Sequence, residues 1–306
     1  MNVNDIKKVL ILGGGHMGQQ IGFQCALSGF DVVVYDISEE VLQGTIKNMT
    51  KLASSFAEQK RITKEEADKL LARITTTTSD TEAAKDADII SESVPENPEI
   101  KGKIFSRFNE LCAERTVFTT NTSSLMPSMF ADATGRPEKL CALHFHDVRS
   151  TNIVDVMPHP RTSPETTQLV AEFARKIGQV PIVMHKENIG FVFNAMLMTW
   201  FESALSLAAN DVASVEDIDR SWMGVLRAPL GPFAVMDQVG LKTVYSITDY
   251  WAKITKKSQS IKNAEFLRKY VEAGKLGAKA KSGFYTYPNP AFFQPGFVSG
   301  LDTKKS

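Results

Sequence analysis

The sequence has few of the features that mark secreted, membrane or nucleic-acid-binding proteins. Its three cysteines are widely spaced in 306 residues, which predicts neither a disulfide framework nor a metal cluster, so we expect a reducing cytoplasmic location and no resident metal. No apolar run reaches membrane-spanning length, and the run before the first glycines is too short for a signal-peptide core. With 35 basic and 35 acidic residues, the formal net charge is zero, so no overall field attracts nucleic acid. Neither a membrane nor nucleic acid is an expected partner.

Short apolar runs alternate with helical patterns over the first part of the chain. Strands alternating with helices predict a doubly wound parallel sheet of the α/β class, a Rossmann domain. A charged helical pair, with a break near residues 61–63 and a capping box at Thr63 and Glu66, predicts a helical insertion at about residues 47–72. The expected strands lie at residues 9–12, 31–35, 74–77, 89–94, 117–120, 140–145, 153–157 and 180–184.

The pattern changes after Asn188. Residues 191–209 form a long, strongly apolar helical stretch, and no convincing strand follows it. We therefore place a domain boundary near Lys186, with a Rossmann domain over residues 1–186 and a helical domain over residues 187–306. The apolar helix needs a deep core or a second subunit to cover it, which favours a homodimer.

A glycine-rich turn gives the first indication of function. Gly13, Gly15 and Gly18 follow an expected strand and open an expected helix, so the backbone can approach a pyrophosphate at the helix N-terminus. Asp36 ends the next strand, 18 residues after Gly18, near the spacing at which an acidic residue takes the ribose hydroxyls. An isoleucine and a serine follow it, with no arginine to meet a 2′-phosphate, which favours NAD over NADP. The alternative is a glycine turn in a protein that binds no nucleotide.

Polar residues at two other strand ends are candidates for catalysis. His144 and His146 lie at the carboxyl end of an expected strand, where α/β sheets place their active sites, and either could serve as a general base. Ser123 belongs to a polar run that follows the strand at residues 117–120. Its alternative role is to cap a helix.

Seven motifs, in order from Val9 to about Tyr287, resemble the 3-hydroxyacyl-CoA dehydrogenase family, and in particular 3-hydroxybutyryl-CoA dehydrogenases. The resemblance implies reversible, NAD-dependent oxidation of an L-3-hydroxyacyl-CoA to the 3-oxoacyl-CoA, as in fatty acid metabolism, by a homodimer. The motifs are GGGHMG, SVPENPEIKGKIF, TNTSSL, ALHF, IGFVFN, APLGPFAVMDQVGL and GKLGAKAKSGFY.

The resemblance also implies catalytic roles. His144 matches the family's catalytic base, and Ser123 and Asn194 match its polar partners around the substrate oxygen, which leaves His146 as an ordinary histidine. The family orients its base with a glutamate. Asp155 stands in its place one position early, which predicts a shortened loop and a carboxylate with less reach.

Three charged residues match cofactor contacts of the family: Glu96, Lys101 and Lys279. Their alternative role is that of solvated surface charges. The insertion resembles a segment that covers CoA in the family, where basic residues could meet phosphates. These residues are Lys51, Lys60 and Arg61.

Two departures from the family leave the substrate open. Asp147 stands where the family has an amide, and residues 149–152 are polar where it is mostly apolar. An alternative is therefore a dehydrogenase of a free 3-hydroxy acid or sugar acid such as L-gulonate, as in the related L-gulonate dehydrogenase and lambda-crystallin group, with Arg149 or Arg227 binding the carboxylate.

A second alternative, from another functional class, is a non-catalytic NAD-binding protein. The joint presence of Ser123, His144 and Asn194 argues against it.

Overall fold

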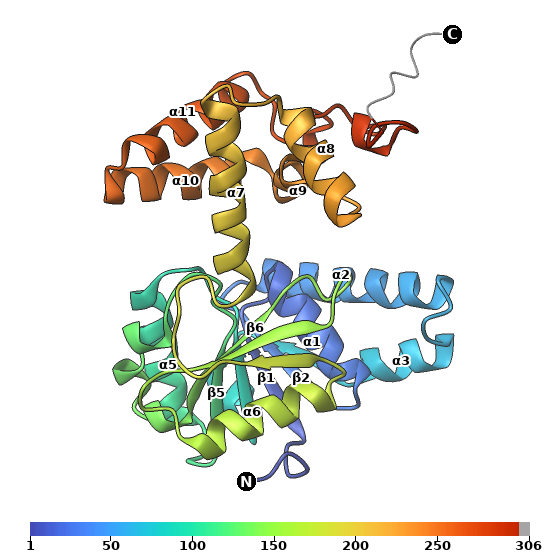
Figure 1. The fold of residues 1–306 in the computed structure, drawn as a ribbon. Coiled ribbons are helices and arrows are strands. Elements are labelled where there is room, and N and C mark those ends of the chain that lie inside the picture. The colour runs from blue at the N-terminus through green and yellow to red at the C-terminus, as the bar shows by residue number, and fades with distance from the viewer. Residues whose placement is uncertain (300–306) are drawn as a thin grey trace. The chain divides into compact units, whose positions relative to one another are not determined.

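The computed structural model describes residues 1–299, which belong to two compact units (Figure 1). The division falls between Val192 and Phe193, rather than near Lys186. Among the described residues, no helix combines the length and the apolar character that a membrane crossing requires.

The first unit contains one eight-stranded sheet, in the order β3-β2-β1-β4-β5-β6-β7-β8. Neighbouring strands from β3 to β6 are parallel, as predicted, but β7 runs antiparallel to β6, and β8 follows the direction of β7. The expectation of a wholly parallel sheet was wrong at this edge, because only antiparallel strands can be joined by a loop as short as residues 146–152. The strands are β1 (Lys8–Leu12), β2 (Asp31–Tyr35), β3 (Ile74–Thr77), β4 (Ile89–Glu92), β5 (Val117–Thr120), β6 (Leu140–Phe145), β7 (Ile153–Pro158) and β8 (Val180–Val183).

Helices cover both faces of this sheet, as the doubly wound architecture requires (Figure 1). Alternate side chains of β1 point to opposite faces of the sheet. Val9 and Ile11 pack in the hydrophobic core with helices α1, α2, α3 and α6. Leu10 and Leu12 pack in the core with helices α4 and α5. The helices are α1 (His16–Leu27), α2 (Glu39–Glu58), α3 (Lys64–Ala72), α4 (Asp80–Ala84), α5 (Pro98–Leu111) and α6 (Pro164–Lys176).

The break between α2 and α3 is set by the predicted capping box. Thr63 Oγ1 accepts a hydrogen bond from the Glu66 amide at 3.1 Å, and the Glu66 carboxylate accepts one from the Thr63 amide at 2.7 Å. This reciprocal pair satisfies two amides that a helix N-terminus leaves unpaired. The break lies where the sequence predicted it, but the first helix runs unbroken from Glu39 to Glu58 and does not begin at about residue 47.

The second unit is helical, which confirms the change of pattern seen in the sequence. Its core includes Phe201, Phe233 and Leu267, contributed by three different helices. Two buried carboxylates connect these helices to the chain after α11. Asp219 accepts hydrogen bonds from the Phe233 and Ala234 amides and from the Tyr285 hydroxyl. Asp237 accepts hydrogen bonds from the Phe284 and Tyr285 amides. The helices are α7 (Phe193–Ala209), α8 (Val215–Leu226), α9 (Pro232–Val239), α10 (Leu241–Thr255) and α11 (Ser258–Glu272).

Candidate active site

The glycine turn has the geometry that close packing against the sheet demands. Gly13 has φ +104°, and a Cβ there would lie 2.8 Å from the Ser93 carbonyl oxygen. A Cβ on Gly18 would lie 1.9 Å from the Gly13 carbonyl oxygen. At Gly15, in contrast, no described atom lies within 4 Å of the position a Cβ would take. The outer glycines are thus required by packing, and the middle one leaves open space at the N-terminus of α1.

The surroundings of this turn fit a dinucleotide. Gly15, the residue before α1, provides no side-chain cap, so the first amides of the helix are available to an anion. Asp36 Oδ2 accepts a hydrogen bond from the Gly14 amide at 2.9 Å, which places the carboxylate beside the turn. The buried Ser93 hydroxyl has no hydrogen-bond partner among residues 1–299. The turn therefore combines open space, free amides, a carboxylate and an unused hydroxyl.

A cavity of about 350 Å³ lies beyond the carboxyl ends of β1, β4, β5 and β6. Ligands of open α/β sheets bind at this edge. The cavity gathers several residues that the sequence singled out. It is lined by Met17, Ser93, Val94, Glu96, Lys101, Asn121, Ser123, His144 and Phe145.

His144 and Asp155 are paired by the register of two strands. Antiparallel β6 and β7 set the two residues directly opposite each other, and His144 Nδ1 lies 3.1 Å from Asp155 Oδ2. Both residues are almost fully buried. The expectation of a carboxylate with less reach is not what the structure shows, because residues directly opposite across a strand pair are close enough for an aspartate to span the gap.

Two further rings surround the His144 imidazole. Phe191, which is buried, packs against it with a centroid distance of 4.7 Å. Phe191 has φ +54°, an unfavourable conformation for a bulky residue that the surrounding fold must maintain. His146 also contacts the His144 ring, with centroids 4.7 Å apart, and its Nε2 lies 3.5 Å from the same Asp155 oxygen. His146 is therefore part of the site and not an ordinary histidine.

The two histidines determine the charge state of Asp155. Burial alone would raise the pKa of this carboxyl, but hydrogen bonds from His144 and His146 outweigh burial and lower the pKa to about 2. Asp155 is thus ionised near neutral pH. A buried anion beside a histidine orients the ring and stabilises it when it gains a proton.

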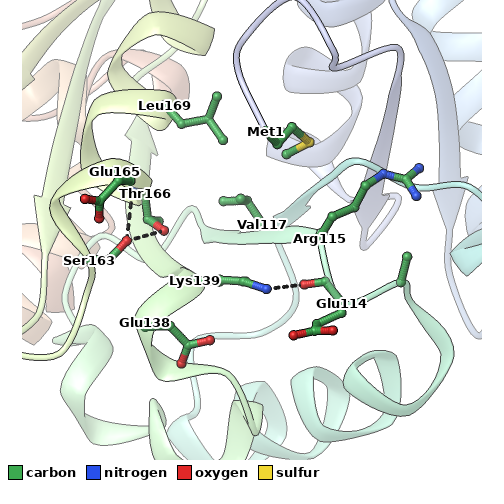
Figure 2. A pocket seen from close by; sticks show the side chains of 11 residues that line it. Met1, Glu114, Arg115, Val117, Glu138, Lys139, Ser163, Glu165, Thr166 and Leu169 are labelled. Carbon is green, nitrogen blue, oxygen red and sulfur yellow. Dashed lines mark hydrogen bonds between the residues drawn. The ribbon is translucent and has the colours of Figure 1, made fainter.

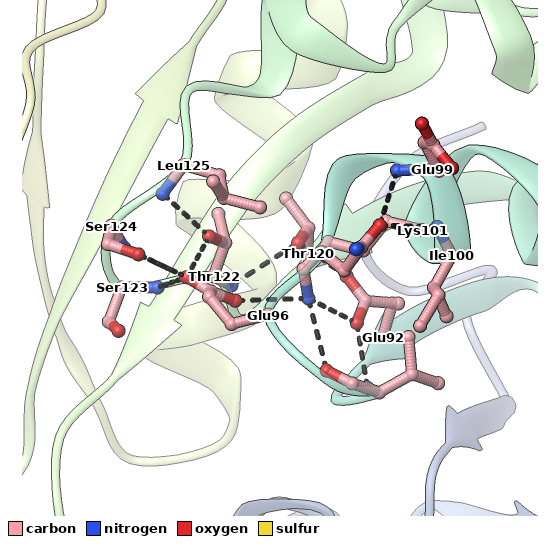
Figure 3. Close-up of polar contacts among 12 residues, drawn as sticks. Glu92, Glu96, Glu99, Ile100, Lys101, Thr120, Thr122, Ser123, Ser124 and Leu125 are labelled. Carbon is pink, nitrogen blue, oxygen red and sulfur yellow. Dashed lines mark hydrogen bonds and ion pairs between the residues drawn. The ribbon is translucent and has the colours of Figure 1, made fainter.

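Glu96 organises the loop that carries Ser123 (Figure 3). Its Oε1 accepts hydrogen bonds from the Thr122 hydroxyl at 2.5 Å, from the Ser123 amide at 3.0 Å and from the Ser124 amide at 3.0 Å. Burial would raise the pKa of Glu96, but these hydrogen bonds and the charge of Lys101 lower it. An ionised Glu96 therefore fixes the backbone around Ser123.

Lys101 forms ion pairs with both Glu96 and the buried Glu92 (Figure 3). Its ammonium lies 2.6 Å from Glu92 Oε1 and 3.3 Å from Glu96 Oε2, and its side chain is only 1% exposed. Lys101 is therefore not a solvated surface charge, whereas the Glu96 side chain is still 36% exposed beside its hydrogen bonds. The predicted contact of each with the cofactor stays a prediction.

The polar loop after His146 is held by its own ion pair. The Asp147 carboxylate accepts hydrogen bonds from the Arg149 guanidinium, and these bonds lower the pKa of Asp147. The Val148 amide donates to Gln20 of α1 at 3.0 Å. The loop is thereby attached to the helix that begins at the glycine turn.

The remaining predicted site residues belong to the second unit. Asn194 is the second residue of α7, and Lys279 lies in a short 3₁₀ turn, Ala278–Ala280. The structure brings together Ser123, His144 and Asp155. That Asn194 and Lys279 join them stays a prediction.

A second cavity, of about 610 Å³, lies at the amino ends of β5 and β6 (Figure 2). Acidic Glu114, Glu138 and Glu165 alternate around it with basic Arg115 and Lys139. This mixed charge favours no particular ligand, and it is the edge at which open α/β sheets do not bind their ligands.

Sequence reasoning missed Glu92, and it set His146 aside once the resemblance pointed to His144. Asn121, in the polar run that follows β5, has a side-chain oxygen that accepts a hydrogen bond from the Phe145 amide at 2.7 Å. A usable signal existed for His146, because residues two apart in a strand share a face. No local signal reveals Glu92, whose partner comes from a helix.

Comparison with known proteins agrees with this geometry. The NAD-binding domain of 3-hydroxyacyl-CoA dehydrogenase matches residues 8–188, and the C-terminal domain of the same family matches residues 190–287. The chain belongs to the 3-hydroxyacyl-CoA dehydrogenase family, which makes it an NAD-dependent oxidoreductase of that type and confirms the class expected from the motifs.

Individual relatives match along most of their length. The human mitochondrial hydroxyacyl-coenzyme A dehydrogenase is 33% identical over 288 residues, covering 92% of this chain and 91% of the relative. A probable 3-hydroxybutyryl-CoA dehydrogenase of Bacillus subtilis is 32% identical, with 92% and 98% covered.

Two solved structures share the whole fold. The (S)-3-hydroxybutyryl-CoA dehydrogenase of Ralstonia eutropha superposes with a TM-score of 0.84 at 29% identity, covering 93% of this chain and all of the other. A diketoreductase that acts on dicarbonyl compounds superposes with a TM-score of 0.85 at 37% identity, covering 92% and 99%.

Proposed function

We propose that this enzyme oxidises an L-3-hydroxyacyl-CoA at its hydroxyl-bearing carbon, and catalyses the reverse reduction, with His144 as the general base. Its Nδ1 is occupied by Asp155, which leaves Nε2 to take the proton from the substrate hydroxyl. NAD, when bound, accepts the hydride from the same carbon. The buried His144–Asp155 pair, in the wall of a cavity that also contains Ser123, carries this proposal.

Asp155 and His146 act through His144. The Asp155 carboxylate keeps the proton of the neutral ring on Nδ1 and stabilises the imidazolium after proton transfer. His146 contacts the same carboxylate oxygen, which gives the aspartate a second support. We assign His146 a positioning role.

Ser123 and Asn194 are proposed to hold the substrate oxygen. Hydrogen bonds to that oxygen orient the carbon for hydride transfer and stabilise charge that develops during the reaction. The contacts of Glu96 with the Ser123 and Ser124 amides support the required position of the loop.

Cofactor contacts are proposed for two groups of residues. The amides of the glycine turn meet the pyrophosphate, and Asp36 takes the ribose hydroxyls. Charged residues then act nearer the reacting end. The proposed residues are Gly13, Gly15, Gly18, Asp36, Glu96, Lys101 and Lys279.

The decisive test is NADH oxidation with acetoacetyl-CoA beside free acetoacetate, in the wild type and in His144→Ala. We expect turnover of the thioester, and a loss of about 10²- to 10⁴-fold in the variant, the range for removal of a general base. NADH binding should persist in the variant, which shows that the fold is intact. Wild-type activity in His144→Ala would refute its role as the base.

Acyl-CoA recognition is proposed for the α2–α3 insertion. Lys51, Lys60 and Arg61 are all exposed there, although the Arg61 guanidinium also lies 3.7 Å from the centre of the Phe56 ring. The triple alanine variant should raise KM for the thioester and leave NADH binding unchanged. An unchanged KM would remove this role.

A second candidate is reduction of a free dicarbonyl acid or ester, or oxidation of a free 3-hydroxy acid such as L-gulonate. The 37% identity to a diketoreductase and the polar loop at residues 147–152 favour it. Arg149 is a weak carboxylate anchor, because Asp147 already neutralises it. If free acids alone react, and Arg149→Ala or Arg227→Ala raises their KM while the triple variant has no effect, this candidate replaces the thioester.

A homodimer is proposed through the apolar face of α7 and α8. Val225 and Leu226 are 80% and 58% exposed, and they line an apolar groove together with Trp200 and Trp222. Exposed apolar surface of this kind favours association with a second copy. Sedimentation should show a dimer that Val225→Asp with Leu226→Asp converts to a monomer.

A cytoplasmic location is proposed because the three cysteines are free thiols. Cys25, Cys112 and Cys141 are free and buried. Burial raises the pKa of each thiol, which keeps it protonated and unreactive.

A further inference from the structure

Three metal-ligating side chains meet beside the cavity. His144 and His146 lie two residues apart, so they point to the same face of the sheet. Asp155 is directly opposite His144 and diagonal to His146 in the adjacent strand. Within the part of the chain that the structure describes, this is the one group of three such side chains whose ligand atoms lie within 4.8 Å of one another.

Two of the three separations between these atoms match the requirements of a zinc ion. Ligand atoms about 2.0–2.1 Å from a tetrahedral ion lie roughly 3.4 Å from one another. Asp155 Oδ2 lies 3.1 Å from His144 Nδ1 and 3.5 Å from His146 Nε2. The third separation, between the ligand atoms of the two histidines, is at most 4.8 Å, so a histidine side chain has to shift before all three atoms can contact one ion. Two imidazoles and a carboxylate are also a donor set that zinc favours.

We propose that His144, His146 and Asp155 form an inhibitory zinc site that overlaps the catalytic pair. Sequence reasoning expected no metal in this chain, and the site exists only because the β6–β7 register brings its ligands together. His146 gives an ion its route of entry, since its side chain is 19% exposed whereas His144 and Asp155 are 5% and 2% exposed. Water supplies the fourth ligand.

The inhibition follows from the chemistry of imidazole. A neutral ring that binds a metal through Nδ1 carries its proton on Nε2. Nε2 then cannot accept the proton of the substrate hydroxyl. Zinc bound here traps His144 in the wrong tautomer and occupies the carboxylate that stabilises the imidazolium. The inhibitory part of this inference rests on His144 being the base, but the binding part does not.

Metal binding is tested first, without substrate. Co²⁺ is added to the full-length protein, and its visible absorption is followed in the wild type, His146→Gln and His185→Gln. His185 is exposed and lies outside the trio, so its variant is the matched control. We expect one Co²⁺ per chain, displaced by Zn²⁺, with affinity lowered at least about 10-fold in His146→Gln and unchanged in His185→Gln.

Activity is tested second. Zn²⁺ should inhibit NADH oxidation by the wild type and the His185→Gln control at equal concentrations, EDTA should reverse the inhibition, and His146→Gln should need at least about 10-fold more Zn²⁺. Absence of stoichiometric Co²⁺ binding, or equal affinity in the wild type and His146→Gln, overturns the site. Co²⁺ binding in a protein that turns over no thioester leaves the metal site standing and refutes the proposed substrate instead.

Discussion

Two polar assemblies at the carboxyl edge of the sheet are built by different means. The glycine turn after β1 is an arrangement of backbone, in which Gly13 and Gly18 are present because any side chain would collide with a neighbouring carbonyl group. The β6–β7 assembly is an arrangement of side chains, in which Asp155, His144 and His146 depend on strand register. The first tolerates no added atoms at Gly13 or Gly18, and the second depends on the charge of Asp155.

The largest effect is expected in the side-chain assembly. Asp155→Asn keeps the size of the side chain but removes the charge that orients His144, and kcat should fall by about 10³- to 10⁴-fold, as for other carboxylate–histidine pairs. The NADH dissociation constant should not change. Fluorescence titration of NADH beside steady-state kinetics measures both values.

Asp155→Glu sharpens this test. The extra methylene lengthens the side chain at a position directly opposite His144, where the aspartate already reaches Nδ1 at 3.1 Å. We expect partial activity, above that of Asp155→Asn. Equal activity of the two variants would mean that the carboxylate charge is not what His144 requires.

The backbone assembly should respond to added volume. Gly15→Ala places a methyl group in open space, so the melting temperature should be close to that of the wild type. NADH affinity should fall by about 10- to 100-fold, because the methyl group blocks the close approach of the pyrophosphate. Gly18→Ala collides with Gly13 and should lower the melting temperature itself. If Gly15→Ala binds NADH normally, the pyrophosphate does not approach this residue.

A smaller loss of activity is expected when Glu96 is changed, because its carboxylate acts through the loop that carries Ser123. Glu96→Gln keeps an oxygen for the Ser123 and Ser124 amides but loses the ion pair with Lys101. We expect a fall of about 10-fold in kcat/KM, in line with the loss of a charge-assisted hydrogen bond of 1.5–3 kcal/mol only partly replaced by the amide. Ser123→Ala, measured in parallel, should cost at least as much. A normal Glu96→Gln enzyme would show that the loop needs no charge.

Two buried carboxyl groups, those of Asp155 and Asp219, should make the free energy of unfolding depend on pH in opposite directions. The folded-state pKa of Asp155 is about 2, below its ordinary value of 3.8, so its stabilisation is present above pH 3.8 and is lost as the pH falls towards 2. Burial raises the pKa of Asp219 to about 6. The contribution of this group to the free energy of unfolding is therefore most favourable below pH 3.8, and it is lost as the pH rises through 6.

Urea unfolding at pH 2 to 7 measures these contributions, each on the order of 3 kcal/mol at most. Asp155→Asn should flatten the acid side of the stability curve, and Asp219→Asn the side between pH 4 and 6. If either variant leaves the pH dependence unchanged, the carboxyl concerned does not have the shifted pKa.

Local pattern predicted much of the fold. Residues 31–35, 74–77, 117–120 and 140–145 were expected as strands and are strands with those bounds. Such short β-branched or apolar runs between turn residues are determined by nearest neighbours in the chain. The capping box at Thr63 could be predicted from the sequence for the same reason, since its two hydrogen bonds join residues three apart.

By itself, the sequence determined the Rossmann and helical parts, the glycine turn with Asp36, and His144 as one of two candidate bases. All of these depend on local spacing. Tertiary structure alone decided the reversed direction of β7, the place of His146 in the site, and the burial of Lys101 between Glu92 and Glu96. Each is a contact between different elements, and its energy depends on register and desolvation, which no local pattern of residues records.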